Sequence, residues 1–178
     1  MLVITAITAV QAQRMLPRQK GLEIGAGLLS SDEPGRNYFL DLLLTVNGRN
    51  GGYWIWGAEY THQYADYKTL QIPLETYLGE VGYSLRLLGN TRKSINVNAA
   101  VTGVGGYEAI NRGKAKLNDG AVVQNKEGFV YGAGGRLSFE TYLSDRFVLV
   151  LQGKAKVLWG TDLGQFRSAA GLGLRFNF

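Results

Sequence analysis

The C-terminal segment, residues 165–178, alternates without a break between two kinds of side chain. Every second position from Ala170 to Phe178 is apolar, and the positions between them carry Gly171, Gly173, Arg175 and Asn177. A period of two indicates a β-strand with one apolar and one polar face. The chain must therefore fold so that the two faces of its strands meet different surroundings.

The same alternation recurs along the chain. It predicts further strands near residues 20–31, 36–47, 52–64, 70–87, 94–109, 128–143 and 146–159. Compact turns rich in Gly, Asn and Asp are expected at 47–52, 88–93 and 144–145. The other four connections begin near Ser31, Ala65, Ile110 and Gly160, and the third, roughly 110–127, is the longest. Alternating short and long connections predict an all-β fold, an eight-stranded antiparallel up-and-down barrel.

The polar face of these strands holds nearly all of their charge. Its members are Glu23, Asp41, Glu59, Glu80, Arg86, Arg136, Glu140, Lys154, Lys156, Arg167 and Arg175. Five acids balance six bases, which favours mutual pairing in a narrow lumen because an unpaired buried charge is costly. The same face is rich in glycine, which makes room beside long side chains inside a small barrel. We therefore predict a structural network of lumen charges rather than an ion path.

The aromatic residues of the apolar face gather at the strand ends. One expected belt contains Trp54, Trp56, Phe147, Phe176 and Phe178. The other contains Tyr38, Tyr64, Tyr77, Tyr107, Phe129, Trp159 and Phe166. Two belts around an aliphatic zone match the two interfaces of a membrane. The sequence thus predicts a transmembrane barrel, and the closing strand with its terminal aromatic resembles those of bacterial outer-membrane barrels; the alternative is a soluble calycin-like barrel or sandwich with an apolar cavity.

The rest of the composition narrows the choice of class. There is no cysteine, so disulfides, thiolate metal sites and lipoprotein anchors are excluded. The net charge of +5 gathers on no single element, so direct binding of nucleic acid is not expected. Residues 1–12 carry no charge and are interpreted as the remnant of a signal peptide, which leaves 13–178 as the barrel.

Motifs for chemistry are sparse. The single histidine, His62, shares the apolar face with Trp56 and Tyr60 and is expected at the membrane interface. It could serve a lipid-modifying enzyme only if a serine such as Ser30 or Ser31 and the acid Asp66 lay within reach. No spacing suggests a metal or cofactor site. The basic loop 112–126 could contact lipid phosphates or a partner, as in a small adhesin-like barrel.

An ordered set of short motifs resembles the TraO family of conjugative-transposon outer-membrane proteins. The set comprises Trp56-Gly57-Ala58-Glu59-Tyr60, Tyr67-Lys68, Ile72-Pro73, residues 105–111, 117–121 and 140–146, Leu158-Trp159-Gly160 and Gly164-Gln165-Phe166. The resemblance covers roughly residues 50–178. It implies a structural or binding part in a type IV secretion-like apparatus for DNA transfer, with outer-membrane lipid and other apparatus proteins as partners. It carries no catalytic residues.

Overall fold

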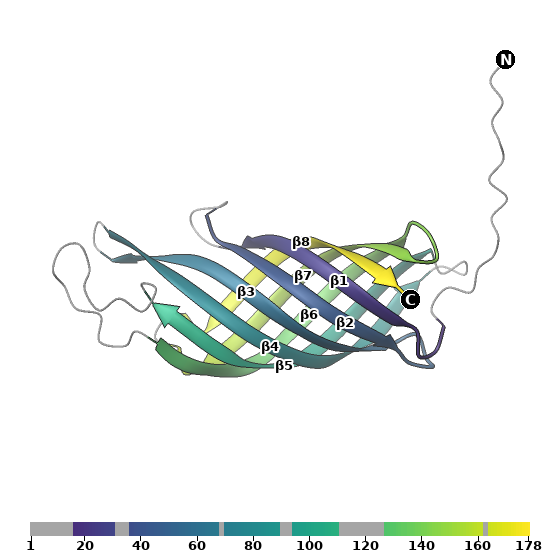
Figure 1. The fold of residues 1–178 in the computed structure, drawn as a ribbon, viewed down its shortest axis with the longest axis horizontal. Coiled ribbons are helices and arrows are strands. Elements are labelled where there is room, and N and C mark those ends of the chain that lie inside the picture. Colours follow the sequence, from purple (N-terminus) through teal and green to yellow (C-terminus); the bar gives the residue numbers. More distant parts are fainter. Residues whose placement is uncertain (1–15, 31–35, 68–69, 90–93, 111–126, 162–163) are drawn as a thin grey trace, which may run out of the picture.

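The computed structural model describes residues 16–30, 36–67, 70–89, 94–110, 127–161 and 164–178, and these residues form one closed barrel (Figure 1). The strands are β1 (Lys20–Leu29), β2 (Tyr38–Asn47), β3 (Tyr53–Tyr67), β4 (Leu70–Gly89), β5 (Ile95–Ile110), β6 (Glu127–Tyr142), β7 (Phe147–Trp159) and β8 (Phe166–Asn177). Each strand pairs antiparallel with the next, and β8 pairs with β1 to close the ring. The predicted eight-stranded up-and-down barrel is confirmed.

One predicted connection is wrong. A long connection was expected from Ala65, but β3 continues to Tyr67 and pairs with β4 as far as Leu70. Polar and apolar residues mix in this part of the sequence, so alternation gave no signal there. Backbone pairing between neighbouring strands continues without alternating side chains, because the hydrogen bonds between strands do not depend on which face is apolar. Residues 31–35 and 111–126 of the predicted connections, and the proposed signal remnant 1–12, lie outside the described residues.

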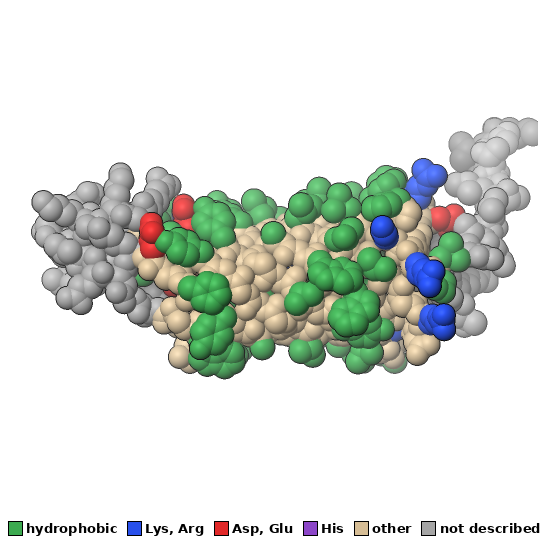
Figure 2. Space-filling view, turned by 60° about the horizontal axis from the view of Figure 1, so that its bottom comes forward, with side chains coloured by type: hydrophobic (Ala, Val, Ile, Leu, Met, Phe, Trp, Pro, Cys, Tyr) green, Lys and Arg blue, Asp and Glu red, His purple; other side chains and the backbone are tan. Residues whose placement is uncertain are grey.

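The two faces of the strands separate as the alternation predicts. In β7, Val148 and Val150 point inward and are fully buried, whereas Leu149 and Leu151 between and after them are 42% and 54% exposed. Every member of the two predicted aromatic belts is exposed on the outer surface. Figure 2 shows large hydrophobic side chains gathered toward both ends of one face, with fewer of them between.

The interior is layered along the barrel axis. Near the end where β1 begins and β8 ends, Leu43, Tyr53, Ile55 and Ala100 form one apolar cluster. The opposite end, where β2, β4, β6 and β8 begin, is called the loop end. Toward it, Leu78, Val104, Val130 and Leu158 form another cluster. Charged side chains occupy the space around these clusters. Among the described residues, no helix is long and apolar enough to cross a membrane.

Candidate functional site

The predicted lumen charges all lie on inward positions of the strands. Nine of them are buried side chains with 7% or less exposure: Glu23, Asp41, Glu59, Glu80, Arg136, Glu140, Lys154, Lys156 and Arg175. Arg167 is almost as well covered, with a side chain 9% exposed. Arg86 is half-buried near the C-terminal end of β4. The register between β4 and β5 shifts there, between Arg86 and Leu88. The structure therefore brings these residues into one enclosed space.

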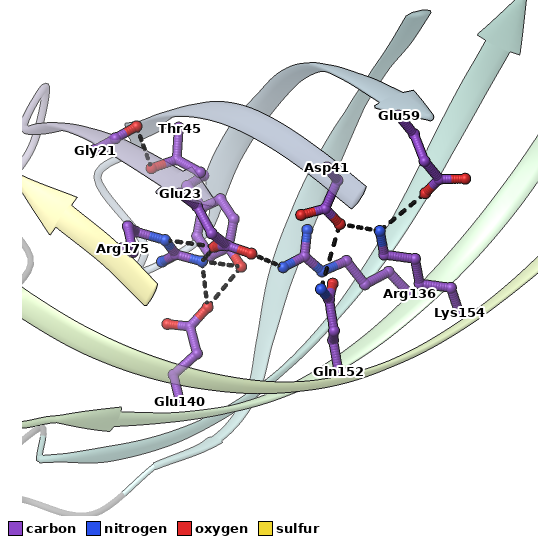
Figure 3. A network of polar contacts seen from close by, with 11 residues as sticks. Gly21, Glu23, Asp41, Thr45, Glu59, Arg136, Glu140, Gln152, Lys154 and Arg175 are labelled. Carbon is purple, nitrogen blue, oxygen red and sulfur yellow. Dashed lines mark hydrogen bonds and ion pairs between the residues drawn. The ribbon is translucent and has the colours of Figure 1, made fainter. Parts of the chain in front are cut away.

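The first group of contacts surrounds Glu23 on β1 (Figure 3). Arg136 from β6 binds one carboxylate oxygen, and Arg175 from β8 donates to the other from Nε at 2.9 Å and Nη2 at 2.8 Å. Arg175 also donates to Glu140 at 2.8 Å, and the hydroxyl of Tyr53 donates to the same Glu140 oxygen at 2.6 Å. Such charge-assisted, forked contacts are the strongest that these groups form. They tie four strands together across the lumen.

A second group lies nearer the middle of the barrel, around two lysines of β7. Lys154 binds Asp41 of β2 and Glu59 of β3, the latter at 2.9 Å (Figure 3). Lys156 lies 2.8 Å from Glu59 and 3.1 Å from Glu80 of β4. Each lysine bridges two acids on neighbouring strands. β7 is thereby held against the opposite wall, and the charges compensate each other.

The third group contains an acid that was not predicted. Glu108 on β5 is 3% exposed and lies 2.5 Å from Arg167 of β8. Thr161 donates to Glu108 at 2.7 Å, and Arg167 donates to the hydroxyl of Thr76 at 2.9 Å. Alternation could have identified it, because Tyr107 faces outward and its neighbour must face inward. With Glu108 the interior charges that the structure describes comprise six acids and six bases.

The space found among the lumen charges is small. A void of about 20 Å³ lies among Phe39, Glu59, Leu78, Lys154 and Arg167. This is room for about one water molecule, by the usual measure of one probe sphere. An eight-stranded barrel is just wide enough for its side chains to fill it. The geometry therefore fits a packed, cross-linked interior.

His62 lies on the outer face of β3, as predicted, but it is not an exposed interfacial residue. It is only 6% exposed because the rings of Tyr38 and Tyr64 lie 5.4 and 5.0 Å from it. Its Nδ1 lies 3.8 Å from Glu75 of β4 and 3.4 Å from the hydroxyl of Tyr60. Sequence alternation assigns the face correctly but cannot show that neighbouring rings cover the imidazole.

The serine-based site considered for His62 is not assembled in the described residues. Ser30 lies at the end of β1 and donates its backbone N–H to Ser168 of β8, two strands away from β3. Ser31 and the side chain of Asp66 lie outside the described residues. Within the described ranges, no group of three or more His, Cys, Asp or Glu residues could hold a metal ion.

The comparison with protein families decides the identity. The model for "Conjugative transposon protein TraO" matches residues 16–178, which is nearly the whole chain. The chain belongs to the TraO family. The match includes β1 and β2, to which the sequence motifs contributed little. A search of curated proteins gave no match.

Several bacterial proteins of known structure have the same fold. Neisserial surface protein A superposes with a TM-score of 0.65 at 9% identity, covering 90% of this chain and 96% of that one. Ail, the attachment invasion locus protein of Yersinia pestis, gives 0.59 at 11% identity, with 92% and 100% covered. The N-terminal barrel domain of Pseudomonas aeruginosa OprF gives 0.57 at 10% identity, with 91% and 98% covered. At these identities the likeness establishes the fold of this TraO-family chain and nothing about its ligands.

Proposed function

We propose that the protein is an outer-membrane barrel of a conjugative, type IV secretion-like transfer apparatus, with a structural or binding role in DNA transfer between cells. The observation that carries the proposal is the TraO family match over residues 16–178. The exposed apolar outer surface with its aromatic belts supports insertion in a lipid bilayer. The filled lumen supports a role in contact rather than passage.

In this proposal the barrel anchors and the ends make the contacts. The interior ion pairs hold the cylinder closed, so the rims present fixed surfaces. At the end where β1 begins and β8 ends, the exposed basic residues are Arg18, Lys20, Arg49 and Arg146, and Figure 2 shows basic side chains gathered there. In an outer-membrane barrel the first strand begins and the last strand ends on the periplasmic side, so in this proposal this end faces the periplasm. A basic rim favours apparatus partners with acidic surfaces.

The first experiment combines location and transfer. The protein should fractionate with outer membranes and show heat-modifiable mobility in detergent, because a folded barrel resists unfolding until it is boiled. Deleting its coding sequence from the donor should abolish transfer, and the intact chain should restore it. A photo-crosslinker at Arg146 should capture proteins of the same transfer system. The same crosslinker at lipid-facing Leu151 is the matched control and should capture none.

Two results would overturn parts of this proposal. A soluble periplasmic protein without a mobility shift would overturn the membrane assignment, and normal transfer without the protein would overturn the role in conjugation. The alternative of a lipid-modifying enzyme is tested by mass spectrometry of lipid A and phospholipids from cells with and without the protein. We expect identical lipid profiles, and a modified lipid that depends on the protein would favour the enzyme.

A further inference from the structure

A trough runs across the outer face of β2, β3 and β4. Its volume is about 470 Å³. Its walls are Leu40, Leu42, Tyr60 and Tyr77, and its floor is the pair Ala58 and Gly79, which lie opposite each other in the register of β3 and β4. Because this face is the apolar exterior of the barrel, the trough opens to hydrocarbon rather than to water.

The small residue on the floor is not needed for packing within the barrel. A methyl group added at Gly79 would meet only one atom within 4 Å, the carbonyl oxygen of Gly105 at 3.6 Å, which is an ordinary contact. By contrast, a methyl group at inward-facing Gly57 of β3 would collide with Leu43. Gly57 therefore makes room for the barrel's own side chains, whereas Gly79 faces outward and leaves the floor of the trough open.

The loop end of the trough is polar. Tyr60 belongs to the wall of the trough and lies 3.4 Å, through its hydroxyl, from Nδ1 of His62. Glu75 lies 3.8 Å from the same nitrogen, and the guanidinium of Arg36 lies 5.7 Å from the ring centroid of Tyr64. Ionisable side chains on a lipid-facing surface are costly and usually have a function. An apolar trough with a hydrogen-bonding end is complementary to a lipid, because the trough can hold an acyl chain while the polar end contacts the headgroup.

We propose that this trough binds one lipopolysaccharide molecule, with an acyl chain of its lipid A against Ala58 and Gly79. The phosphorylated sugar head would lie against Arg36, Tyr60 and Tyr64, and the two tyrosine rings lie beside the covered imidazole of His62. Arg36 and the tyrosine hydroxyls supply donors suited to phosphate and sugar oxygens. The inference rests on the outer-membrane location proposed above, because the loop end then meets the leaflet that contains lipopolysaccharide.

The test measures lipid that stays bound to the purified barrel. The protein is extracted from outer membranes in mild detergent and examined by native mass spectrometry. We expect one lipopolysaccharide molecule per chain on the native protein. Gly79→Leu, which fills the trough, should reduce this occupancy at least tenfold. Gly153→Leu is the matched control on β7, because Gly153 is also lipid-facing and has nothing within 4 Å of an added methyl group.

Several results would overturn the proposal. These are a native protein without retained lipid, a retained phospholipid in place of lipopolysaccharide, or equal occupancy in Gly79→Leu and the native chain. Heat-modifiable mobility verifies that both variants fold. If fractionation shows that the chain is not in the outer membrane, the proposed function fails on its own. The site is then tested separately by refolding the protein into vesicles that contain lipid A, where Gly79→Leu should still bind less lipid than Gly153→Leu.

Discussion

At the scale of single residues, the interior depends on pairs in which neither partner can be removed alone. Glu108 and Arg167 show this most simply, because their 2.5 Å contact is supported by two threonine hydroxyls. Removing the acid leaves a guanidinium that is only 9% exposed without its counter-charge. Breaking one partner of a buried pair typically costs more than replacing both partners.

We therefore expect Glu108→Ala to lower the free energy of unfolding by about 3–5 kcal/mol, and Arg167→Ala to do the same. The double variant should lose clearly less than the sum of the two. Urea titrations of the refolded barrel in lipid vesicles measure all three values and close the double-mutant cycle. Strictly additive losses would show that the two side chains do not interact.

In the lumen it is the removal of a charge that is costly, whereas on the outer surface it is the addition of one, because there a charge meets hydrocarbon. Leu151 lies in the middle of β7 and is 54% exposed. Leu151→Arg should cost about 2–4 kcal/mol of stability in lipid. Leu143, which is 62% exposed in the turn after β6, is the control, and Leu143→Arg should cost about 0–1 kcal/mol. Equal losses at the two positions would contradict the placement of the membrane on the barrel.

At the scale of elements, closure depends on how closely β1 and β8 approach. Gly27 and Gly171 lie opposite each other in this pair. A methyl group on either one would collide with the ring of Phe39 and with the backbone of the partner strand. The ring of Phe39 therefore covers the closing seam at the place where both strands lack side chains. Glycine is required here because of the close approach, not because of backbone conformation.

Gly171→Val should consequently prevent or strongly retard closure. Gly153→Val, on the outer face of neighbouring β7, should fold normally because nothing lies within 4 Å of its added methyl group. The measurement is the fraction of protein that reaches the heat-modifiable form after refolding in detergent. A normal yield of folded Gly171→Val would show that the seam tolerates a side chain.

At the scale of the whole molecule, opposite charges come from different parts of the chain. The interior acids of β1–β5 are Glu23, Asp41, Glu59, Glu80 and Glu108, and the interior bases of β6–β8 are Arg136, Lys154, Lys156, Arg167 and Arg175. Among the interior side chains that the structure describes, only Arg86 on β4 and Glu140 on β6 depart from this division. Most ion pairs therefore join the first part of the barrel to the last. Attraction across the lumen favours the closed ring over open sheets.

The same packing predicts the electrical behaviour of the inserted barrel. Apolar clusters and three groups of ion pairs occupy the described lumen, and a void among them has a volume of about 20 Å³. Purified protein in planar bilayers should give no steady ion conductance, because hydrated ions cannot pass a filled eight-stranded barrel. Reproducible single-channel steps that scale with the amount of protein would contradict a packed lumen.

Alternation alone predicted the eight strands, their faces and the members of both aromatic belts. This was possible because the period of two is a local property, and lipid outside and polar contacts inside impose it on every strand. It failed between Ala65 and Tyr67, where the sequence mixes polar and apolar residues and the strand continues through backbone pairing. The same local reasoning placed His62 on the outer face but not under its tyrosine neighbours.

The sequence by itself thus determined what kind of barrel this chain forms and which side chains enter the lumen. Only the tertiary structure decided which acid meets which base. Glu23 joins Arg136 and Arg175, which lie far along the chain, and Lys154 joins Asp41 and Glu59. These pairings depend on the stagger and closure of the strands, which set the height of each residue along the barrel axis. The trough over Ala58 and Gly79 appears for the same reason, because small residues from two strands must reach the same height to form it.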